Sequence, residues 1–186
     1  MKASCLVYKV LTPVRAPLID TFSDEEMKRI VEKRYGKEVA EHLDYMFERR
    51  PFNGKMMVYY PPTTFYGAVK RAMKDAGLDS DKLAVKRLRA LARTSLGVFC
   101  DDRAVVRKQS MYIDEDGDKK PTLVIYEYLP QGTECLVATL LPPAALKNIV
   151  DGLLPALRMI TIGGWREKGF GKLVFVGIRE CEVTIQ

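Results

Sequence analysis

A glycine-rich stretch near the C-terminus constrains the fold more strongly than any other part of this chain. Residues 162–172 contain four glycines, three cations, Trp165 and Phe170, and they follow an apolar helical stretch and open a strand. A Walker A loop instead needs Gly-Lys-Ser/Thr at the start of a helix, and a dinucleotide fingerprint must follow a strand and enter a helix. The order of elements therefore argues against both of these nucleotide-binding folds.

The same stretch has the chemistry of a phosphate-binding loop. Glycine allows the backbone to approach a ligand closely, exposed amides and cations suit phosphate oxygens, and aromatic rings can stack on bases. A second interpretation is a plain tight turn, with Trp165 and Phe170 packed inward. The candidate binding residues of this loop are Gly163, Gly164, Trp165, Arg166, Lys168, Gly169, Phe170, Gly171 and Lys172.

The size and charge of the chain favour one globular domain with a polyanionic partner. The 186 residues are 47% hydrophobic, which is enough to build a core. The net charge of +6 is concentrated in residues 70–108, which hold eleven Lys or Arg against five Asp or Glu. Such a local excess of positive charge points most often to nucleic acid.

Targeting and metal-binding signals are missing from the sequence. The first ten residues lack the apolar core of a signal peptide, and no run is long enough to span a bilayer, so we expect a cytoplasmic protein without membrane contact. The four cysteines form no Cys-x-x-Cys pair and His42 is the only histidine. We therefore expect no metal site, no cofactor, and buried, reduced thiols.

Two amphipathic helices are expected to carry the excess positive charge. The first begins at Thr63 or Thr64, either of which can cap it, and ends at Gly77; its polar face presents Lys70 and Arg71. An anion at its N-terminus would meet free amides and a favourable dipole. The second helix is capped by Ser80 and runs to about residue 93. Its cations form a ridge along one face, either a phosphate track or a solvated surface: Lys82, Lys86, Arg89 and Arg93.

The remaining patterns complete an α+β arrangement. A charged amphipathic helix is expected over residues 24–48, and two β-rich runs between 104 and 128 predict a long hairpin arm. Without these two pieces the order is β-α-β-β-α-β, which predicts a ferredoxin-like, RRM-like core. We expect a single domain over residues 1–186, with a helical insertion at 23–50 and a hairpin arm at 104–128.

Two stretches together resemble the RAMP superfamily of CRISPR-associated, ferredoxin-like RNA binders. Residues 60–72 read YPPTTFYGAVKRA and resemble the helix start of these proteins, with a proline, a hydroxyl pair, a glycine and a basic pair. Residues 127–175 begin EYLPQGTE and end with the glycine-rich loop that is the hallmark of the superfamily. The combination most resembles a subunit of a type III effector complex.

The resemblance implies the partners of the chain. The helix start at 63–71 and the loop at 163–172 would contact the backbone of a guide RNA, as in other subunits of such ribonucleoproteins. The hairpin arm would reach toward a target RNA or a neighbouring effector subunit. The expected partners are therefore RNA and other CRISPR effector subunits.

Catalysis and scaffolding remain as alternatives. Some RAMP subunits cut target RNA with an aspartate in the loop after the first strand, where Asp20 is the candidate, although this loop lacks the glycines usual in cutting subunits. Guide-processing endoribonucleases of the superfamily often use a histidine, and here His42 is the candidate. A single ferredoxin-like copy argues against that class. The third alternative is a non-catalytic scaffold that binds protein partners.

Overall fold

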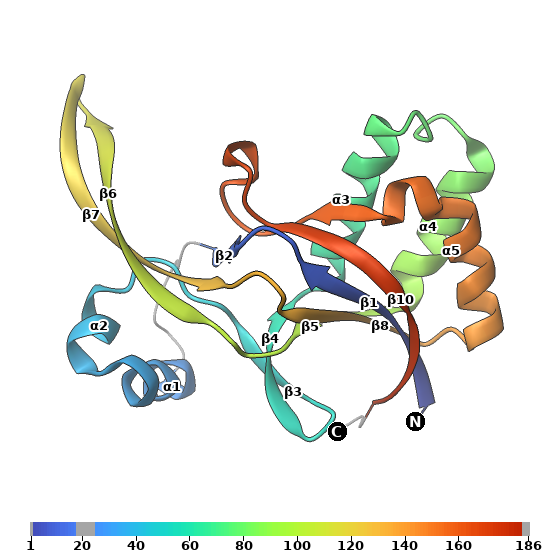
Figure 1. Ribbon diagram of the computed structural model, residues 1–186, viewed down its shortest axis with the longest axis horizontal. Coiled ribbons are helices and arrows are strands. Elements are labelled where there is room, and N and C mark those ends of the chain that lie inside the picture. The colour runs from blue at the N-terminus through green and yellow to red at the C-terminus, as the bar shows by residue number, and fades with distance from the viewer. Residues whose placement is uncertain (1, 18–24, 184–186) are drawn as a thin grey trace.

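The computed structural model describes residues 2–17 and 25–183 as an α+β protein with mostly antiparallel sheets (Figure 1). The α+β class expected from the sequence is confirmed. The described residues include the following α-helices: α1 (Glu25–Tyr35), α2 (Lys37–His42), α3 (Pro62–Asp75), α4 (Lys82–Thr94) and α5 (Pro143–Leu157).

The larger sheet has seven strands, and every neighbouring pair in it is antiparallel. Strands distant in the sequence are adjacent in it, because the N-terminal strand lies between two strands of the C-terminal half. In spatial order the strands are β3 (Arg49–Phe52), β4 (Lys55–Tyr60), β5 (Ser95–Cys100), β8 (Glu134–Thr139), β1 (Lys2–Val10), β10 (Lys172–Glu182) and β9 (Met159–Thr161).

Helices α3, α4 and α5 bury their apolar sides in the main core against one face of this sheet. Phe65, Leu88 and Leu153 are fully or almost fully buried there, together with Leu6 from β1. Each of these helices has its apolar residues at helical spacing, so a single stripe can be buried while the opposite side stays in water. The opposite face of the sheet carries a smaller apolar cluster.

The starts of α3 and α4 differ from the sequence-based assignment. Asp81 caps α4, because its carboxylate accepts hydrogen bonds from the N–H groups of Leu83 and Ala84. The expected cap, Ser80, lies one residue earlier. In α3, Thr63 and Thr64 lie within the first turn, and the cap position is occupied by Pro61 without a side-chain hydrogen bond. Pro62 follows at the first helical position, which suits proline because an N–H there would have no partner within the helix.

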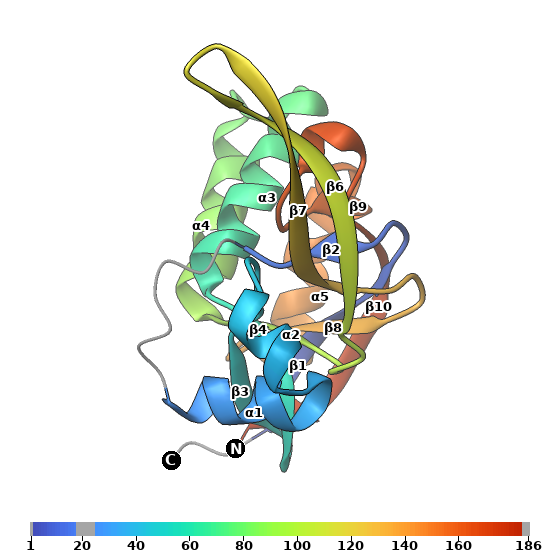
Figure 2. The same ribbon diagram turned by 90° about the vertical axis from the view of Figure 1, so that its left-hand side faces the viewer.

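Strands β6 (Val105–Glu115) and β7 (Asp118–Leu129) form a long antiparallel hairpin that extends away from the body (Figures 1 and 2). Asp116 and Gly117 form its two-residue turn, and both have positive φ, as a type I′ turn requires. The base of the hairpin pairs with β2 (Val14–Arg15) to complete a three-stranded sheet. The loop that precedes residue 18 is thereby held at the base of the hairpin.

The helix predicted over residues 24–48 is two shorter helices, α1 and α2, followed by extended chain. Gly36 separates them with a φ of 89°, a backbone conformation that interrupts a helix. The second helix ends at His42, and residues 49–52 form β3. Burial explains the early end, because Leu43 packs with Val31 against the hairpin whereas Phe47 lies in the main core.

Two further sequence-based assignments are wrong. The cysteines expected as reduced thiols form two disulfides, Cys5–Cys181 and Cys100–Cys135. The sequence could not reveal either pairing, because each joins strands that only the sheet brings together. The two strands expected between residues 172 and 185 form one strand, β10.

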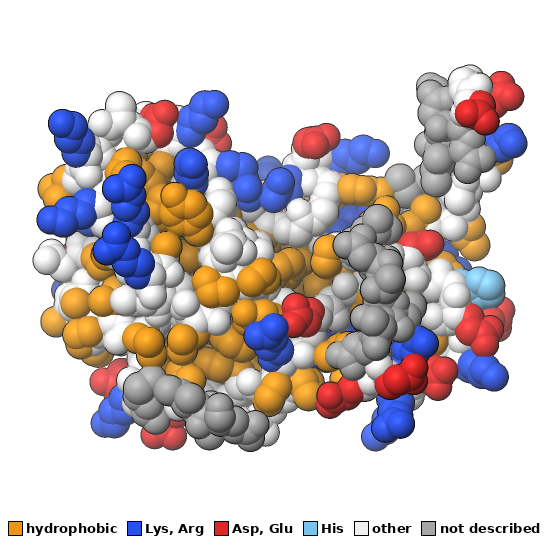
Figure 3. All heavy atoms as spheres, turned by 180° about the vertical axis from the view of Figure 1, so that it is seen from behind, with side chains coloured by type: hydrophobic (Ala, Val, Ile, Leu, Met, Phe, Trp, Pro, Cys, Tyr) orange, Lys and Arg blue, Asp and Glu red, His pale blue; other side chains and the backbone are white. Residues whose placement is uncertain are grey.

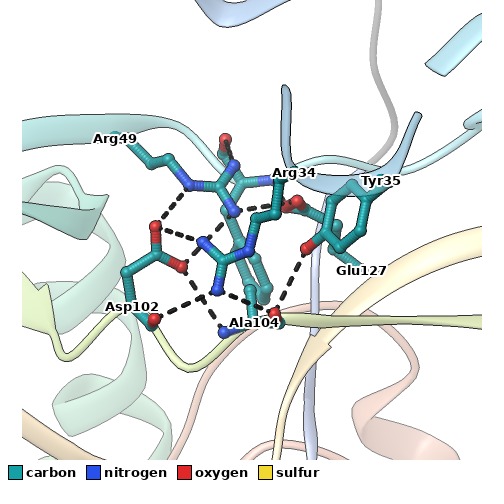
Figure 4. Close-up of polar contacts among 7 residues, drawn as sticks. Arg34, Tyr35, Arg49, Asp102, Ala104 and Glu127 are labelled. Carbon is teal, nitrogen blue, oxygen red and sulfur yellow. Dashed lines mark hydrogen bonds and ion pairs between the residues drawn. The ribbon is translucent and has the colours of Figure 1, made fainter. Parts of the chain in front are cut away.

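A buried polar cluster joins the inserted helices, β3 and the base of the hairpin (Figure 4). Arg49, whose side chain is fully buried, donates from Nη2 to the Glu127 carboxylate at 2.8 Å and from Nε to the Asp102 carboxylate at 2.9 Å. Glu127 is equally buried and also accepts the Phe47 N–H at 3.1 Å. Arg34 of α1 completes the cluster with an ion pair to Asp102 at 2.7 Å. Burying a charge is costly unless it has a partner of opposite charge.

The stability of the protein should fall in acid through Asp102. Burial alone would raise the pKa of this carboxyl, but the ion pairs with Arg49 and Arg34 outweigh burial and hold the pKa below its ordinary value. Its contribution to stability is therefore present above the unfolded-state pKa and is lost as the pH falls through the lower folded-state pKa. Asp102→Asn should cost about 1–2 kcal/mol at pH 7. Urea unfolding at several pH values should show this difference shrinking in acid; a constant difference would contradict it.

Candidate nucleic-acid interface

The glycine-rich loop connects β9 to β10, and it lies beside α3. The Arg71 guanidinium of α3 donates from Nη2 to the carbonyl of Thr161 in β9 at 2.8 Å. Burial, followed by the positive charge of Arg166, lowers the pKa of Arg71. The two arginines, from elements far apart in the sequence, therefore lie close enough to repel each other.

The start of the loop is packed tightly against the chain that follows β1. Gly163 has a φ of 82°, and a Cβ at this position would lie 2.7 Å from the carbonyl oxygen of Arg15. The Tyr60 hydroxyl, at the end of β4, donates to that same carbonyl at 3.4 Å. Only glycine fits here. The loop, β2 and the end of β4, which leads into α3, thus meet at one place.

Backbone hydrogen bonds join the glycine-rich loop to the rest of the described chain only near its two ends. The Gly164 N–H donates to the Arg15 carbonyl at 3.2 Å, and the Gly171 N–H donates to the Pro13 carbonyl at 2.8 Å. Among the described residues, the backbone hydrogen bonds between these points are internal to the loop and close a short 3₁₀ turn, η1 (Arg166–Lys168). Arg166 and Lys168 are exposed on this turn.

Trp165 covers a buried arginine that the sequence did not indicate. The centre of the Arg15 guanidinium lies 2.9 Å from the Trp165 ring centroid and 3.6 Å from the Tyr126 ring centroid. Phe170 stands edge-on to Trp165, with the ring centroids 6.2 Å apart. Trp165 and Phe170 are half-buried, so the inward packing considered as the second interpretation is present in part. The Lys168 ammonium lies 4.7 Å from the Trp165 ring.

The cations predicted to bind phosphate form no ion pair in the part of the chain that the structure describes. Within the described residues, no carboxylate lies within ion-pairing distance of any of them. Lys70 and Arg71 are exposed on α3, and Lys172 is half-buried where β10 begins. The candidate cations of α3 and the loop are Lys70, Arg71, Arg166, Lys168 and Lys172.

The basic ridge of α4 lies on a separate helix, next to α3. Its members are all exposed and, like the loop cations, have no carboxylate partner in the part of the chain that the structure describes. Figure 3 shows Lys and Arg side chains gathered over α3 and α4. The ridge consists of Lys82, Lys86, Arg89 and Arg93. It extends the positive surface but does not reach the loop itself.

Of the two catalytic candidates, the structure describes only His42. Asp20 lies outside the described residues. His42 is exposed at the end of α2, which lies apart from the glycine-rich loop (Figures 1 and 2). Over residues 2–17 and 25–183, no three His, Cys, Asp or Glu side chains come together as a metal site would require. None of the helices in this described part has the length and apolar character needed to cross a bilayer.

Solved structures share the fold of this chain, whereas no family model and no curated protein sequence matches it. A chain of the "Type III-B Cmr-beta bound to cognate target RNA" aligns with a TM-score of 0.57 and 12% identity; the alignment covers 98% of this chain and 61% of that one. This chain therefore spans less than two thirds of that protein. The "Cmr6 from Pyrococcus furiosus" aligns with a TM-score of 0.48 and 14% identity, over 95% of this chain and 99% of that one. A chain of a "Type IV-B CRISPR Complex" aligns with a TM-score of 0.48 and 10% identity, over 100% of this chain and 92% of that one.

The first of these likenesses shows that the chain has the fold of a protein from an RNA-bound Cmr complex. The resemblance to CRISPR-associated RAMP subunits, which the motifs at residues 60–72 and 127–175 indicate, is therefore matched by the fold.

Proposed function

We propose that this chain is an RNA-binding subunit of a CRISPR ribonucleoprotein effector complex, and that it holds the guide RNA backbone between the glycine-rich loop and α3. The observation that carries the proposal is the convergence of Arg71 and Arg166 in one hollow beside β9, where neither forms an ion pair among the described residues, although Asp75 and Glu167 line the same hollow. Two like charges held together are unfavourable until an anion lies between or beside them. A phosphate group satisfies both guanidinium groups through charge-assisted hydrogen bonds.

Other residues extend this surface. Lys70, Lys168 and Lys172 supply further phosphate contacts, and the hydroxyls of Thr63 and Thr64 are placed in the first turn of α3 to donate to RNA oxygens. Phe170 offers a ring for base stacking at the edge of the loop. The basic ridge of α4 continues the positive surface along the path of the RNA strand.

We further propose that the core is ferredoxin-like, with the order β1-α3-β5-β8-α5-β10. The spatial order β10-β1-β8-β5, antiparallel throughout, supports this topology, as do helices α3 and α5 on one face of the sheet. On this basis the chain is one domain, with an insertion at 23–50 and the hairpin arm at 104–128. The arm extends away from the body, which favours contact with target RNA or a neighbouring subunit. The fold shared with a Cmr complex protein supports an assembly of this kind.

The double substitution Arg166→Ala with Lys168→Ala should weaken RNA binding without unfolding the domain. Both side chains project from a turn that makes no backbone hydrogen bond to the rest of the described chain, so their loss leaves the core unchanged. We expect an affinity for single-stranded RNA about 100-fold lower, since each charge-assisted contact contributes about 1.5 kcal/mol. The slope of log affinity against log salt should fall by about 1.4. Fluorescence anisotropy of a labelled oligonucleotide over a salt series measures both.

A matched control is Lys33→Ala with Lys37→Ala, which removes two exposed cations from the inserted helices. This variant should bind RNA as the wild type does. Equal losses in both pairs would mean that net charge alone drives binding and would count against the proposed site. A wild-type protein with little RNA affinity and no salt dependence would instead favour a protein scaffold.

A further inference from the structure

Arg15 is the feature that packing alone does not explain. Its residue is 1% exposed, and its Nη1 and Nη2 groups are buried without a hydrogen-bond partner. The side chain of Arg49 is also fully buried, but it has two carboxylate partners, Asp102 and Glu127. A buried guanidinium without an acceptor is costly, and its cation–π contacts with Trp165 and Tyr126 offset only about 2 kcal/mol of that cost each.

A purely structural role does not require a guanidinium at this position. An apolar side chain of similar volume usually fills a buried site at least as favourably as a buried charge. The groups that distinguish arginine are its N–H donors, and those are the atoms left unpaired here. Their geometry matches the oxygens of a phosphate.

Segment 165–170, which covers Arg15, has a backbone that favours movement. Trp165 adopts left-handed backbone angles, with a φ of 58° and a ψ of 35°, which cost a non-glycine residue about 1 kcal/mol. The segment 165–170 is flanked or interrupted by Gly164, Gly169 and Gly171, and its hydrogen bonds to the rest of the described backbone lie only at the flanking glycines. Gly169 has no heavy atom within 4 Å of where a Cβ would stand. The segment can therefore pivot as a unit.

The surroundings attract an anion. Burial lowers the pKa of Arg15, Tyr126 and Tyr45 raise it, and Arg107 on β6 lowers it. On the covering segment Arg166 and Lys168 are exposed, with Glu167 as the one carboxylate between them. An approaching phosphate would meet Arg166 and Lys168 first. Their movement toward it would draw Trp165 off the guanidinium.

We propose that Arg15 is a concealed phosphate-binding residue, which Trp165 covers in the free protein and which RNA exposes by moving segment 165–170 outward. The inference rests on the proposed function, because the anion is a phosphate of the bound RNA strand. It adds a residue from the chain after β1 to the loop and α3. Segment 165–170 would therefore have two positions, one that covers Arg15 in the free protein and one that exposes Arg15 to bound RNA.

Trp165 is the single tryptophan of the chain, so its emission reports the cover directly. The protein is titrated with a single-stranded oligouridylate of about 10 nucleotides, close to the site size of comparable single-strand binders. At saturation we expect a red-shifted emission maximum and greater quenching by acrylamide, because the indole leaves Arg15 and Tyr126 for solvent. Unchanged emission, or quenching that falls because a base stacks on the indole in place, overturns the proposal.

Arg15→Met tests the phosphate contact itself. We expect RNA affinity to fall about tenfold and the salt slope to fall by about 0.7, the value for one phosphate on a single strand. Arg15→Lys should keep the wild-type slope. The control Lys147→Met, which removes one exposed charge from α5, should change neither quantity.

These outcomes separate the concealed contact from the proposed function. A folded Arg15→Met protein with lower stability but an unchanged salt slope would show that Arg15 is structural, while RNA binding by the loop would stand. If Arg15→Met does not fold, the Trp165 emission of the wild-type protein and the salt dependence of RNA binding by Arg15→Lys still test the proposal. A wild-type protein without salt-dependent RNA binding would overturn both proposals.

Discussion

Replacing Arg49 with methionine is expected to lower the free energy of unfolding by about 3–5 kcal/mol, the range for removing one partner of a buried ion pair. The substitution leaves the Glu127 carboxylate fully buried without its charged partner, although the Phe47 N–H still donates to it. It also removes a partner of Asp102. Urea unfolding followed by circular dichroism measures the loss.

The adjacent residue supplies a matched control. Arg50 also pairs with a carboxylate, that of Glu48 at 2.9 Å, but both side chains are about half exposed. Arg50→Met should therefore change stability by about 1 kcal/mol or less. Similar losses in the two variants would contradict the view that burial makes the Arg49 cluster essential.

Gly171→Ala is the second substitution with a large expected effect, about 3 kcal/mol or more. Gly171 has a φ of 81°, and a Cβ there would collide with the carbonyl oxygen of Ile162. Because the obstacle is backbone, and the Ile162 N–H itself donates to the Gly171 carbonyl at 2.9 Å, neither side can yield without loss of the pairing that closes the loop. Thermal and urea unfolding check the effect on stability, and RNA anisotropy checks the expected loss of binding.

Gly169→Ala in the same loop is the control for backbone strain alone. Its φ of 89° is equally positive, but a Cβ there would meet no heavy atom within 4 Å. We expect a cost of about 1–2 kcal/mol from the left-handed conformation. If Gly169→Ala proved as damaging as Gly171→Ala, close packing under the loop would not be the reason for the glycine at 171.

Local patterns were sufficient for the elements whose residues pack on one side. The apolar spacing in α3 and α4 predicted both helices, since a stripe at helical period can be buried only in that conformation. The two β-rich runs between 104 and 128 likewise predicted the hairpin, and the structure places its turn at Asp116 and Gly117, which both have positive φ. The helix expected over residues 24–48 failed at Gly36 and beyond His42, where the apolar residues divide between two separate cores.

For the candidate site, the sequence identified the cations and glycines but not their buried support. Arg71 and Arg166 were each visible as basic residues in suggestive motifs, and the structure brings them together beside β9. Arg15 gave no such signal, because one arginine in a short loop does not reveal that Trp165 and Tyr126 will enclose it. A polar residue inside an otherwise apolar strand, such as Glu127, was the one available sign of a buried partner.

The sequence by itself determined where α3, α4, the hairpin and the glycine-rich loop lie, because those depend on periodicity and on the φ angles that particular residues allow. Tertiary structure alone decided which distant groups meet: Arg49 with Glu127, Cys5 with Cys181, and Arg15 with Trp165. The physical reason is that these pairings follow from the order of the strands, which makes neighbours of residues that are 78 to 176 positions apart in the chain. No local pattern encodes that order.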